Sequence, residues 1–183
     1  VVHLYEEHGA AFAARLRGMF AIALWDEPAR RLLLVRDRLG IKPLFYGVDD
    51  GILHFGSEIK ALLAAGFPRR LDPEALHDYL TFDFVPGPAT MFAGIRRLDA
   101  GCVLQARTEA PPSIERYWDF PPQPEAGVER SPGDLGRAAG PRLAKELTER
   151  LAEAVRVSLA SDVPVGAFLS GGVDSGLVVA LMA

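Results

Sequence analysis

The stretch SDVPVGAFLSGGVDS, residues 161–175, decides the fold of the last part of the chain. Its apolar run at 165–169 has the length of one buried parallel strand, and the loop SGGVDS at 170–175 follows without a spacer. The apolar residues at 177–182 then recur as in a helix. A strand, a glycine turn and a helix in this order direct backbone N–H groups and the positive end of the helix dipole at an anion. The stretch therefore predicts an anion-binding loop.

The loop carries an acid and has no lysine. A Walker A loop requires a lysine, which is missing from 170–175. The carboxylate of Asp174 would by itself repel a phosphate, so we expect Mg²⁺ to bridge Asp174 to the phosphate oxygens, directly or through water. The alternative is an ordinary glycine turn between a strand and a helix, which would need neither ligand.

SGGVDS behind a short strand resembles the pyrophosphate loop of the ATP pyrophosphatases, which adenylate a carboxylate or carbonyl and release pyrophosphate. The longer string at 161–175 is similar to glutamine-hydrolysing asparagine synthetases in particular. The resemblance implies that ATP is bound by Phe168, Leu169, Ser170, Gly171, Gly172, Asp174 and Ser175. Phe168 and Leu169 would lie against the adenosine, and the alternative for these two is the plain core of a strand.

Composition and charge narrow the class of protein. Of the 183 residues, 49% are hydrophobic and 24% are charged, which is typical of a globular chain. The net charge of −4 and the lack of a basic run argue against nucleic-acid binding. No apolar stretch of the sequence reaches the length of a membrane span. Cys102 is the one cysteine, so a disulfide framework is excluded and a cytoplasmic location is expected.

Residues 1–107 alternate turn signals with apolar runs and predict an α+β domain with an antiparallel sheet. A first helix is expected to be interrupted at Gly9. The strands of an antiparallel meander are expected at 19–25, 31–36, 42–48 and 52–56. Two short helices follow, the first capped by Ser57 and the second by Asp72, with Pro73 at its first helical position.

The runs at 95–98 and 102–105 flank a turn, and we expect them to pair as strands. Prolines and glycines then concentrate in the segment 108–141, which we interpret as a linker, with a surface excursion as the alternative. Leucines at helical spacing predict an amphipathic helix over 143–159. The expected organisation is a sheet domain at 1–107, a linker at 108–141 and the start of a second domain at 142–183.

The first part of the chain is similar to the second half of class II glutamine amidotransferase domains, which precede the synthetase domain in asparagine synthetases. The motifs that carry this similarity are GMFA at 18–21, RDRLGIKPL at 36–44, SEIKAL at 57–62, VPGP at 85–88 and GIRRL at 94–98. The resemblance implies a sheet domain of the N-terminal-nucleophile type. It also implies that 142–183 supplies the first βα unit of an α/β adenine-nucleotide α-hydrolase-like domain.

In that family the nucleophile is an N-terminal cysteine whose own amine acts as the base. Val1 cannot fill this role, so we expect the catalytic cysteine to lie outside the chain and interpret the chain as a fragment truncated at both ends. Arg36 and Asp37 end a strand beside a tight turn, near which the family has its glutamine pocket. Two interpretations stay open: the pair forms an edge of that pocket, or it is a structural ion pair that pins the turn to the sheet.

For the intact protein the resemblance implies glutamine-dependent asparagine synthesis. ATP would adenylate the side-chain carboxylate of aspartate, and ammonia released from glutamine would displace AMP. The implied partners are these small molecules, with no nucleic acid and no membrane, and a homodimer stays open. One alternative is a related amidotransferase or β-lactam-synthetase-like enzyme that adenylates another carboxylate. The other is a degenerate domain that binds a partner without catalysis.

Overall fold

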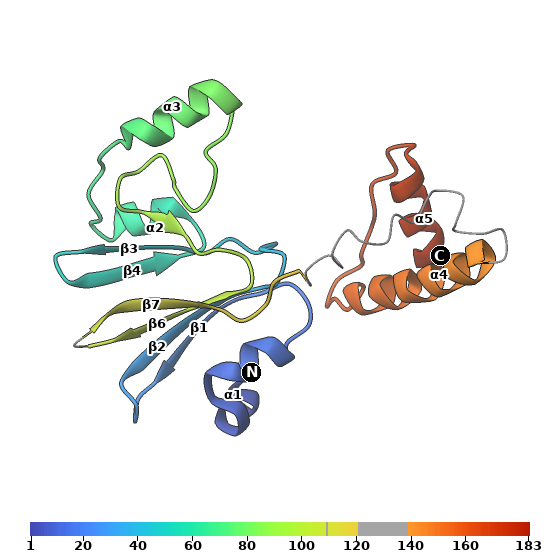
Figure 1. The fold of residues 1–183 in the computed structure, drawn as a ribbon, viewed down its shortest axis with the longest axis horizontal. Coiled ribbons are helices and arrows are strands. Elements are labelled where there is room, and N and C mark those ends of the chain that lie inside the picture. The colour runs from blue at the N-terminus through green and yellow to red at the C-terminus, as the bar shows by residue number, and fades with distance from the viewer. Residues whose placement is uncertain (109, 121–138) are drawn as a thin grey trace, which may run out of the picture. The chain divides into compact units, whose positions relative to one another are not determined.

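The computed structural model describes residues 1–108, 110–120 and 139–183. The chain divides into two compact units, Val1–Pro121 and Pro122–Ala183. The sheets belong to the first unit, and the described residues of the second unit, 139–183, form two helices (Figure 1). In chain order the elements are α1 (Val2–His8), η1 (Gly9–Arg15), β1 (Ala21–Asp26), β2 (Arg31–Arg36), β3 (Phe45–Asp49), β4 (Ile52–Gly56), α2 (Ile59–Ala64), α3 (Pro73–Phe82), β5 (Arg96–Arg97), β6 (Cys102–Arg107), β7 (Ala110–Arg116), α4 (Ala139–Ser158) and α5 (Val173–Met182).

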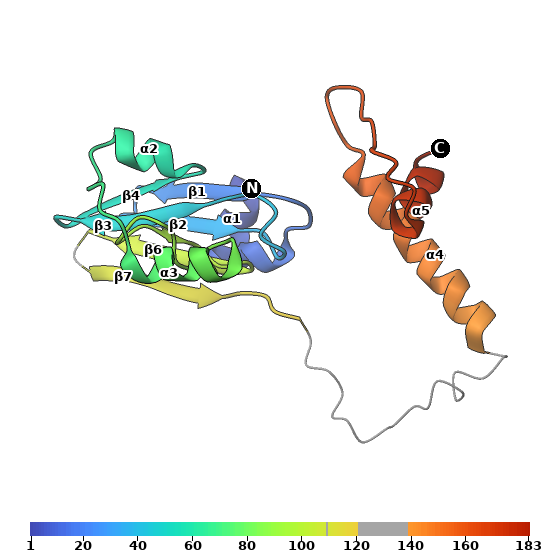
Figure 2. The same cartoon turned by 90° about the horizontal axis from the view of Figure 1, so that it is seen from above.

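Two antiparallel sheets form the first unit, with strand orders β1-β2-β6-β7 and β4-β3-β5. Figures 1 and 2 show the two sheets as stacked layers, with α2 and α3 beyond the smaller sheet and α1 beside the larger one. A cluster of buried residues from the larger sheet and from the connections lies between the layers: Leu34, Leu44, Leu98, Cys102 and Leu104. Partly buried Tyr46 and Leu53 of the smaller sheet pack against it. Antiparallel sheets with helices were expected, and this part of the fold prediction is confirmed.

The first four strands do not form the single meander that the turn signals predicted. β1 and β2 pair as a hairpin in the larger sheet, whereas β3 and β4 pair as a hairpin in the smaller one. β2 is flanked on its other side by β6. Its residues Leu33, Leu34 and Val35 are fully buried, because helices cover one face of the larger sheet and the second sheet covers the other. Because β6 occupies the second edge of β2, β3 cannot pair there, and the chain leaves this layer after β2.

The runs at 95–98 and 102–105 do not pair with each other as expected. β5 pairs with β3, and β6 pairs with β2 and β7. β7 lies within the segment that was interpreted as a linker, so that interpretation is wrong for Ala110–Arg116. β7 is an edge strand, where Pro111 and Pro112 are tolerated although they cannot donate hydrogen bonds. The linker residues 121–138 lie outside the described part of the chain.

Local signals placed the helices of the first unit well. The first helix is interrupted at Gly9, as expected, where φ is 56° and the chain continues as the 3₁₀ helix η1. The carboxylate of Asp72 caps α3 by accepting from the backbone of the second and third residues after it, with Pro73 at the first position. For α2 the expected cap was wrong by one residue, since Glu58 rather than Ser57 precedes the helix and makes no side-chain cap bond.

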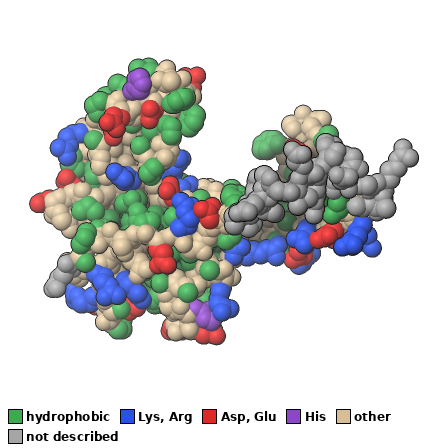
Figure 3. All heavy atoms as spheres, in the orientation of Figure 1, with side chains coloured by type: hydrophobic (Ala, Val, Ile, Leu, Met, Phe, Trp, Pro, Cys, Tyr) green, Lys and Arg blue, Asp and Glu red, His purple; other side chains and the backbone are tan. Residues whose placement is uncertain are grey.

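In the second unit, α4 and α5 pack against each other. Ion pairs three or four residues apart run along α4, among them Arg150 with Glu146 and Arg156 with Glu153, and Figure 3 shows basic and acidic side chains together on this helix. The strand expected at 165–169 is not formed, and Phe168 is fully exposed. A parallel strand requires a neighbour for its hydrogen bonds, and the described residues of this unit contain no strand. Among the described helices, none has both the length and the hydropathy to cross a membrane.

Candidate functional site

The loop at 170–175 has the geometry of an anion-binding turn. Gly171 has a φ of 80°, in the left-handed region that glycine occupies at little cost, and Gly172 is the N-cap of α5. No side chain caps this helix, so its first backbone N–H groups have no side-chain partner. The hydroxyl oxygens of Ser170 and Ser175 lie 2.9 Å apart across the turn, and Ser175 also donates to the carbonyl oxygen of Gly172 at 3.1 Å. Hydrogen-bond donors, both backbone N–H groups and serine hydroxyls, are therefore concentrated at the N-terminus of α5.

Asp174 lies in the first turn of α5 and is exposed, so a bound ion could reach its carboxylate. Within the described residues, no group of three His, Cys, Asp or Glu side chains could hold a metal ion. A magnesium ion at Asp174 would therefore take its remaining ligands from phosphate oxygens and water, a pattern that is usual for Mg²⁺. The residues present fit such an ion.

The two apolar residues before the loop are exposed to solvent. Phe168 is fully exposed and Leu169 is 66% exposed. Neither belongs to a strand, so the strand-core alternative for these two is not what the structure shows. Their side chains remain open to a flat apolar group beside the loop.

In the first unit, Asp37 organises the turn between the two sheets. Its carboxylate is 1% exposed and accepts hydrogen bonds from backbone N–H groups around the turn. These come from Lys42 at 2.9 Å, Ile41 at 3.0 Å, Leu39 at 3.2 Å and Phe20 at 3.4 Å. Burial alone would raise the pKa of the Asp37 carboxyl, but these amide hydrogen bonds outweigh burial, so the pKa lies below its usual value.

Arg36 ties the same turn to the end of β5. Its guanidinium, 8% exposed as a residue, donates to three carbonyl oxygens. These belong to Lys42 at 2.8 Å, Leu98 at 2.6 Å and Gly40 at 2.6 Å. The turn is therefore pinned to the sheets, as one of the two interpretations expected. The pinning differs from the expected ion pair, because Arg36 and Asp37 both direct their hydrogen bonds to the backbone.

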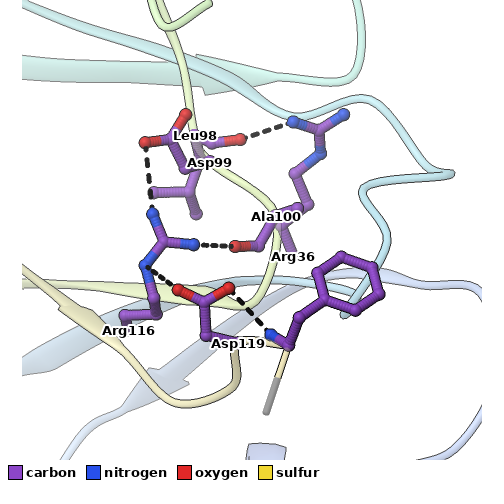
Figure 4. A network of polar contacts seen from close by, with 7 residues as sticks. Arg36, Leu98, Asp99, Ala100, Arg116 and Asp119 are labelled. Atoms are coloured by element: carbon purple, nitrogen blue, oxygen red, sulfur yellow. Dashed lines mark hydrogen bonds and ion pairs between the residues drawn. The ribbon is translucent and has the colours of Figure 1, made fainter. Parts of the chain in front are cut away.

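The end of β7 also contacts this turn, through Arg116, which no motif in the sequence marked. Arg116 donates to the carbonyl oxygen of Ala100 at 3.2 Å and forms ion pairs with Asp99 at 3.8 Å and Asp119 at 3.7 Å (Figure 4). Figure 4 also shows Arg36 reaching the carbonyl oxygen of Leu98 from the other side. The turn at 99–101 is thus held between Arg36 and the last residues of the first unit.

Comparison with known proteins assigns the two parts of the chain. Residues 1–118 match the family described as Glutamine amidotransferase domain, and this match covers more than half of the chain. The chain therefore belongs to the glutamine amidotransferase domain family. Residues 146–183, which contain the loop at 170–175, match the start of the family described as Asparagine synthase.

Individual relatives match nearly the whole length of this chain. The putative glutamine-hydrolysing asparagine synthetase of Mycobacterium tuberculosis is 40% identical over 182 residues, which are 97% of this chain and 27% of that protein. Asparagine synthetase 1 of Bacillus subtilis is 34% identical over 177 residues, 97% of this chain and 26% of that protein. Amidase chry2 of Gibberella zeae is 36% identical over 183 residues, the whole of this chain and 26% of that protein. The chain spans about a quarter of the length of these curated relatives.

Proposed function

We propose that the intact protein is a glutamine-dependent asparagine synthetase. In this reaction ATP adenylates the side-chain carboxylate of aspartate, and ammonia released from glutamine displaces AMP. The observation that carries the proposal is the uncapped N-terminus of α5, with Gly171 in the left-handed region and two serine hydroxyls beside it. This arrangement suits a phosphate chain, and it lies in the part of the chain that matches the asparagine synthase family.

Under this proposal, each residue of the loop has a distinct task. The first amides of α5 and the hydroxyls of Ser170 and Ser175 would bind phosphate oxygens, while Gly171 and Gly172 would let the backbone approach closely. Asp174 would hold Mg²⁺, whose charge would offset that of the phosphates. Phe168 and Leu169 would pack against the adenosine, which would bury two exposed apolar side chains.

In the first unit, the turn held by Arg36 and Asp37 would form an edge of the glutamine pocket. Both side chains already form hydrogen bonds with backbone groups. Contact with glutamine would therefore come from the main chain of the turn. We also propose that this unit has the N-terminal-nucleophile arrangement, that an α-hydrolase-like synthetase domain begins near residue 142, and that the enzyme is cytoplasmic and a homodimer.

A second candidate function has a specific observation in its favour. Amidase chry2 matches the whole of this chain at 36% identity, about as well as the curated asparagine synthetases do. The adenylated carboxylate could therefore belong to a molecule other than aspartate. The loop would act on ATP in the same way, so the two candidates differ only in the acyl acceptor.

The test uses the full-length gene product and measures AMP and pyrophosphate released from ATP. We expect release to depend on aspartate, and Asp174→Asn to lower its rate by about a hundredfold or more, since a catalytic metal contributes several kcal/mol. The matched control is Glu149→Gln on the exposed face of α4, which should leave the rate unchanged.

The outcomes separate the candidates. AMP release that requires a different carboxylate would select the second candidate function. Undiminished release by Asp174→Asn would remove the metal role of Asp174. A wild-type protein that releases no AMP with any carboxylate would leave only the non-catalytic alternative.

A further inference from the structure

A cavity of about 430 Å³ opens in the first unit beside the turn that Arg36 holds. Its wall comes from three separate stretches: the turn at 36–40, the loop at Gly87, and residues 97–100. The charged side chains in this wall are Arg36, Arg97 and Asp99. The wall therefore carries two positive charges and one negative charge around a space large enough for a small molecule.

The backbone of Arg97 is hydrogen-bonded, whereas its side chain has no hydrogen-bond partner within the described residues. Its N–H donates to the carbonyl oxygen of Pro88 at 2.8 Å, and it pairs with Phe45 in the smaller sheet. Arg97 is partly buried, and in the part of the chain that the structure describes its guanidinium makes no hydrogen bond or ion pair. A planar group with five N–H donors thus lines the cavity without a protein acceptor, and an oxyanion in the cavity could accept from it.

The other two charged side chains in the wall, Arg36 and Asp99, already have partners in the protein. Arg36 uses its guanidinium on three carbonyl oxygens, and Asp99 is paired with Arg116 at 3.8 Å. Burial, and next the nearby positive charge of Arg97, lower the pKa of Arg36. The two guanidinium groups are therefore close enough to repel each other, and an anion between or beside them would reduce that repulsion.

Two glycines keep the wall of the cavity open. A side chain at Gly87 would collide with the guanidinium of Arg97, so only glycine allows Arg97 its observed position. A Cβ at Gly40, where φ is 65°, would lie 3.0 Å from the guanidinium of Arg36. Both loops thus approach the arginines with bare backbone, which leaves room for a ligand of a few atoms.

We infer that this cavity binds a compact oxyanion, a phosphate or a carboxylate, through the guanidinium of Arg97. The site lies in the unit that does not contain the loop at 170–175, and the inference does not rest on the proposed synthetase activity. Arg97 supplies the charge and a two-pronged donor set, Arg36 supports it as a second positive charge, and the backbone at Gly40 and Gly87 permits close approach.

Titration of the ¹⁵N-labelled chain with inorganic phosphate tests the inference residue by residue. We expect saturable shifts of the backbone amides of Gly40, Gly87 and Ala100, which line the cavity. Phosphate bound at the other candidate site would shift Gly171 and Gly172 instead, so the two sites report separately. Acetate is the second probe: shifts with phosphate alone assign the cavity to phosphates, and shifts with acetate alone assign it to carboxylates.

Variants on one short strand supply the control. Arg97→Gln removes the charge at similar size and should weaken binding about tenfold or more, whereas Arg97→Lys should retain part of it. Arg96→Gln alters the neighbouring residue, which is exposed and lies outside the cavity wall, and it should bind like the wild type. The inference is overturned if neither anion shifts the cavity amides, or if Arg97→Gln and Arg96→Gln bind with equal affinity.

Discussion

The hydroxyl of Tyr117 donates a 2.8 Å hydrogen bond to the carbonyl oxygen of Arg36, although 81 positions separate the two residues. The backbone N–H groups of Tyr117 and Trp118 both donate to the carbonyl oxygen of Gly101. Arg38, in the same turn as Asp37, places its guanidinium 5.8 Å from the ring centroid of Trp118. The last residues of the sheet domain are therefore attached to the turn that connects its two layers.

Removing the Tyr117 hydroxyl should change how the chain responds to alkali. Burial, and next the nearby Asp37 carboxylate, raise the pKa of Tyr117 to about 12. An unfolded tyrosine has a pKa of about 10, so the stabilising contribution of the folded phenol is complete below that pH and is lost as pH rises toward the folded value. We expect Tyr117→Phe to lose less stability across this window in urea unfolding than the wild type does. At neutral pH it should be less stable by about 1 kcal/mol.

Other tyrosines limit the size of this difference. Burial also raises the pKa of Tyr5 and of Tyr46, so the variant should keep part of the alkaline response. The exposed Tyr79 serves as the control, and Tyr79→Phe should follow the wild-type profile. Wild type and Tyr117→Phe that lose stability equally at high pH would contradict the prediction.

Asp37→Asn should destabilise the first unit strongly at neutral pH. An amide can accept through one oxygen only, and its NH₂ group would face backbone N–H donors in a buried site. We expect a loss of about 2–4 kcal/mol in urea unfolding, because charge-assisted hydrogen bonds are lost and donors are left unsatisfied. Asp50→Asn is the control, since Asp50 is exposed and asparagine tolerates its positive φ.

Asp37→Asn should also lose less stability than the wild type as the pH falls. The pKa of Asp37 is lowered in the folded chain, so its contribution is complete above the unfolded value of about 3.9 and is lost as pH falls through the folded pKa. Wild type should lose this contribution below that pH, whereas Asp37→Asn has none to lose. An unchanged acid slope in the variant would show that Asp37 is not a source of acid sensitivity.

Gly101→Ala should separate the docked end of β7 from the turn. Gly101 has a φ of 65°, and a Cβ there would overlap the carbonyl oxygen of Trp118. Gly51→Ala is a matched comparison, because Gly51 also has a positive φ, 73°, but has open space around it. We expect Gly51→Ala to cost about 1 kcal/mol, from backbone strain alone, and Gly101→Ala to cost more in urea unfolding followed by tryptophan fluorescence. Equal losses in the two variants would mean that the contact with Trp118 is of no consequence.

Features encoded by neighbouring residues could be predicted from the sequence. Asp72 followed by Pro73 gave the start of α3 correctly, and the glycines at 171–172 marked the turn before α5. These signals are local, since a cap or a left-handed turn depends on a few adjacent residues. The position of the candidate anion-binding loop could therefore be predicted from its own residues alone.

Features that depend on distant pairing could not be predicted in this way. The turn signals around β1 to β4 are compatible with one meander or with two hairpins, and what decides between them is that the second edge of β2 pairs with β6, which lies far along the chain, rather than with β3. Arg36 meets the carbonyl oxygen of Leu98 across 62 positions, and no spacing rule reports such a contact. No local pattern distinguishes Arg97 from Arg96, because adjacent arginines on a short strand are both expected to be solvated and only the distant loop at Gly87 sets them apart.

The prolines of β7 bear on how the larger sheet behaves at high concentration. β7 and β1 are the two edges of that sheet, and an edge strand offers its free N–H and C=O groups to a strand of another molecule. Pro111 and Pro112 have no N–H to offer, and β7 is also irregular opposite residues 105–107 of β6. Edge-to-edge association of this sheet is therefore expected at β1, beside the half-exposed Trp25, rather than at β7.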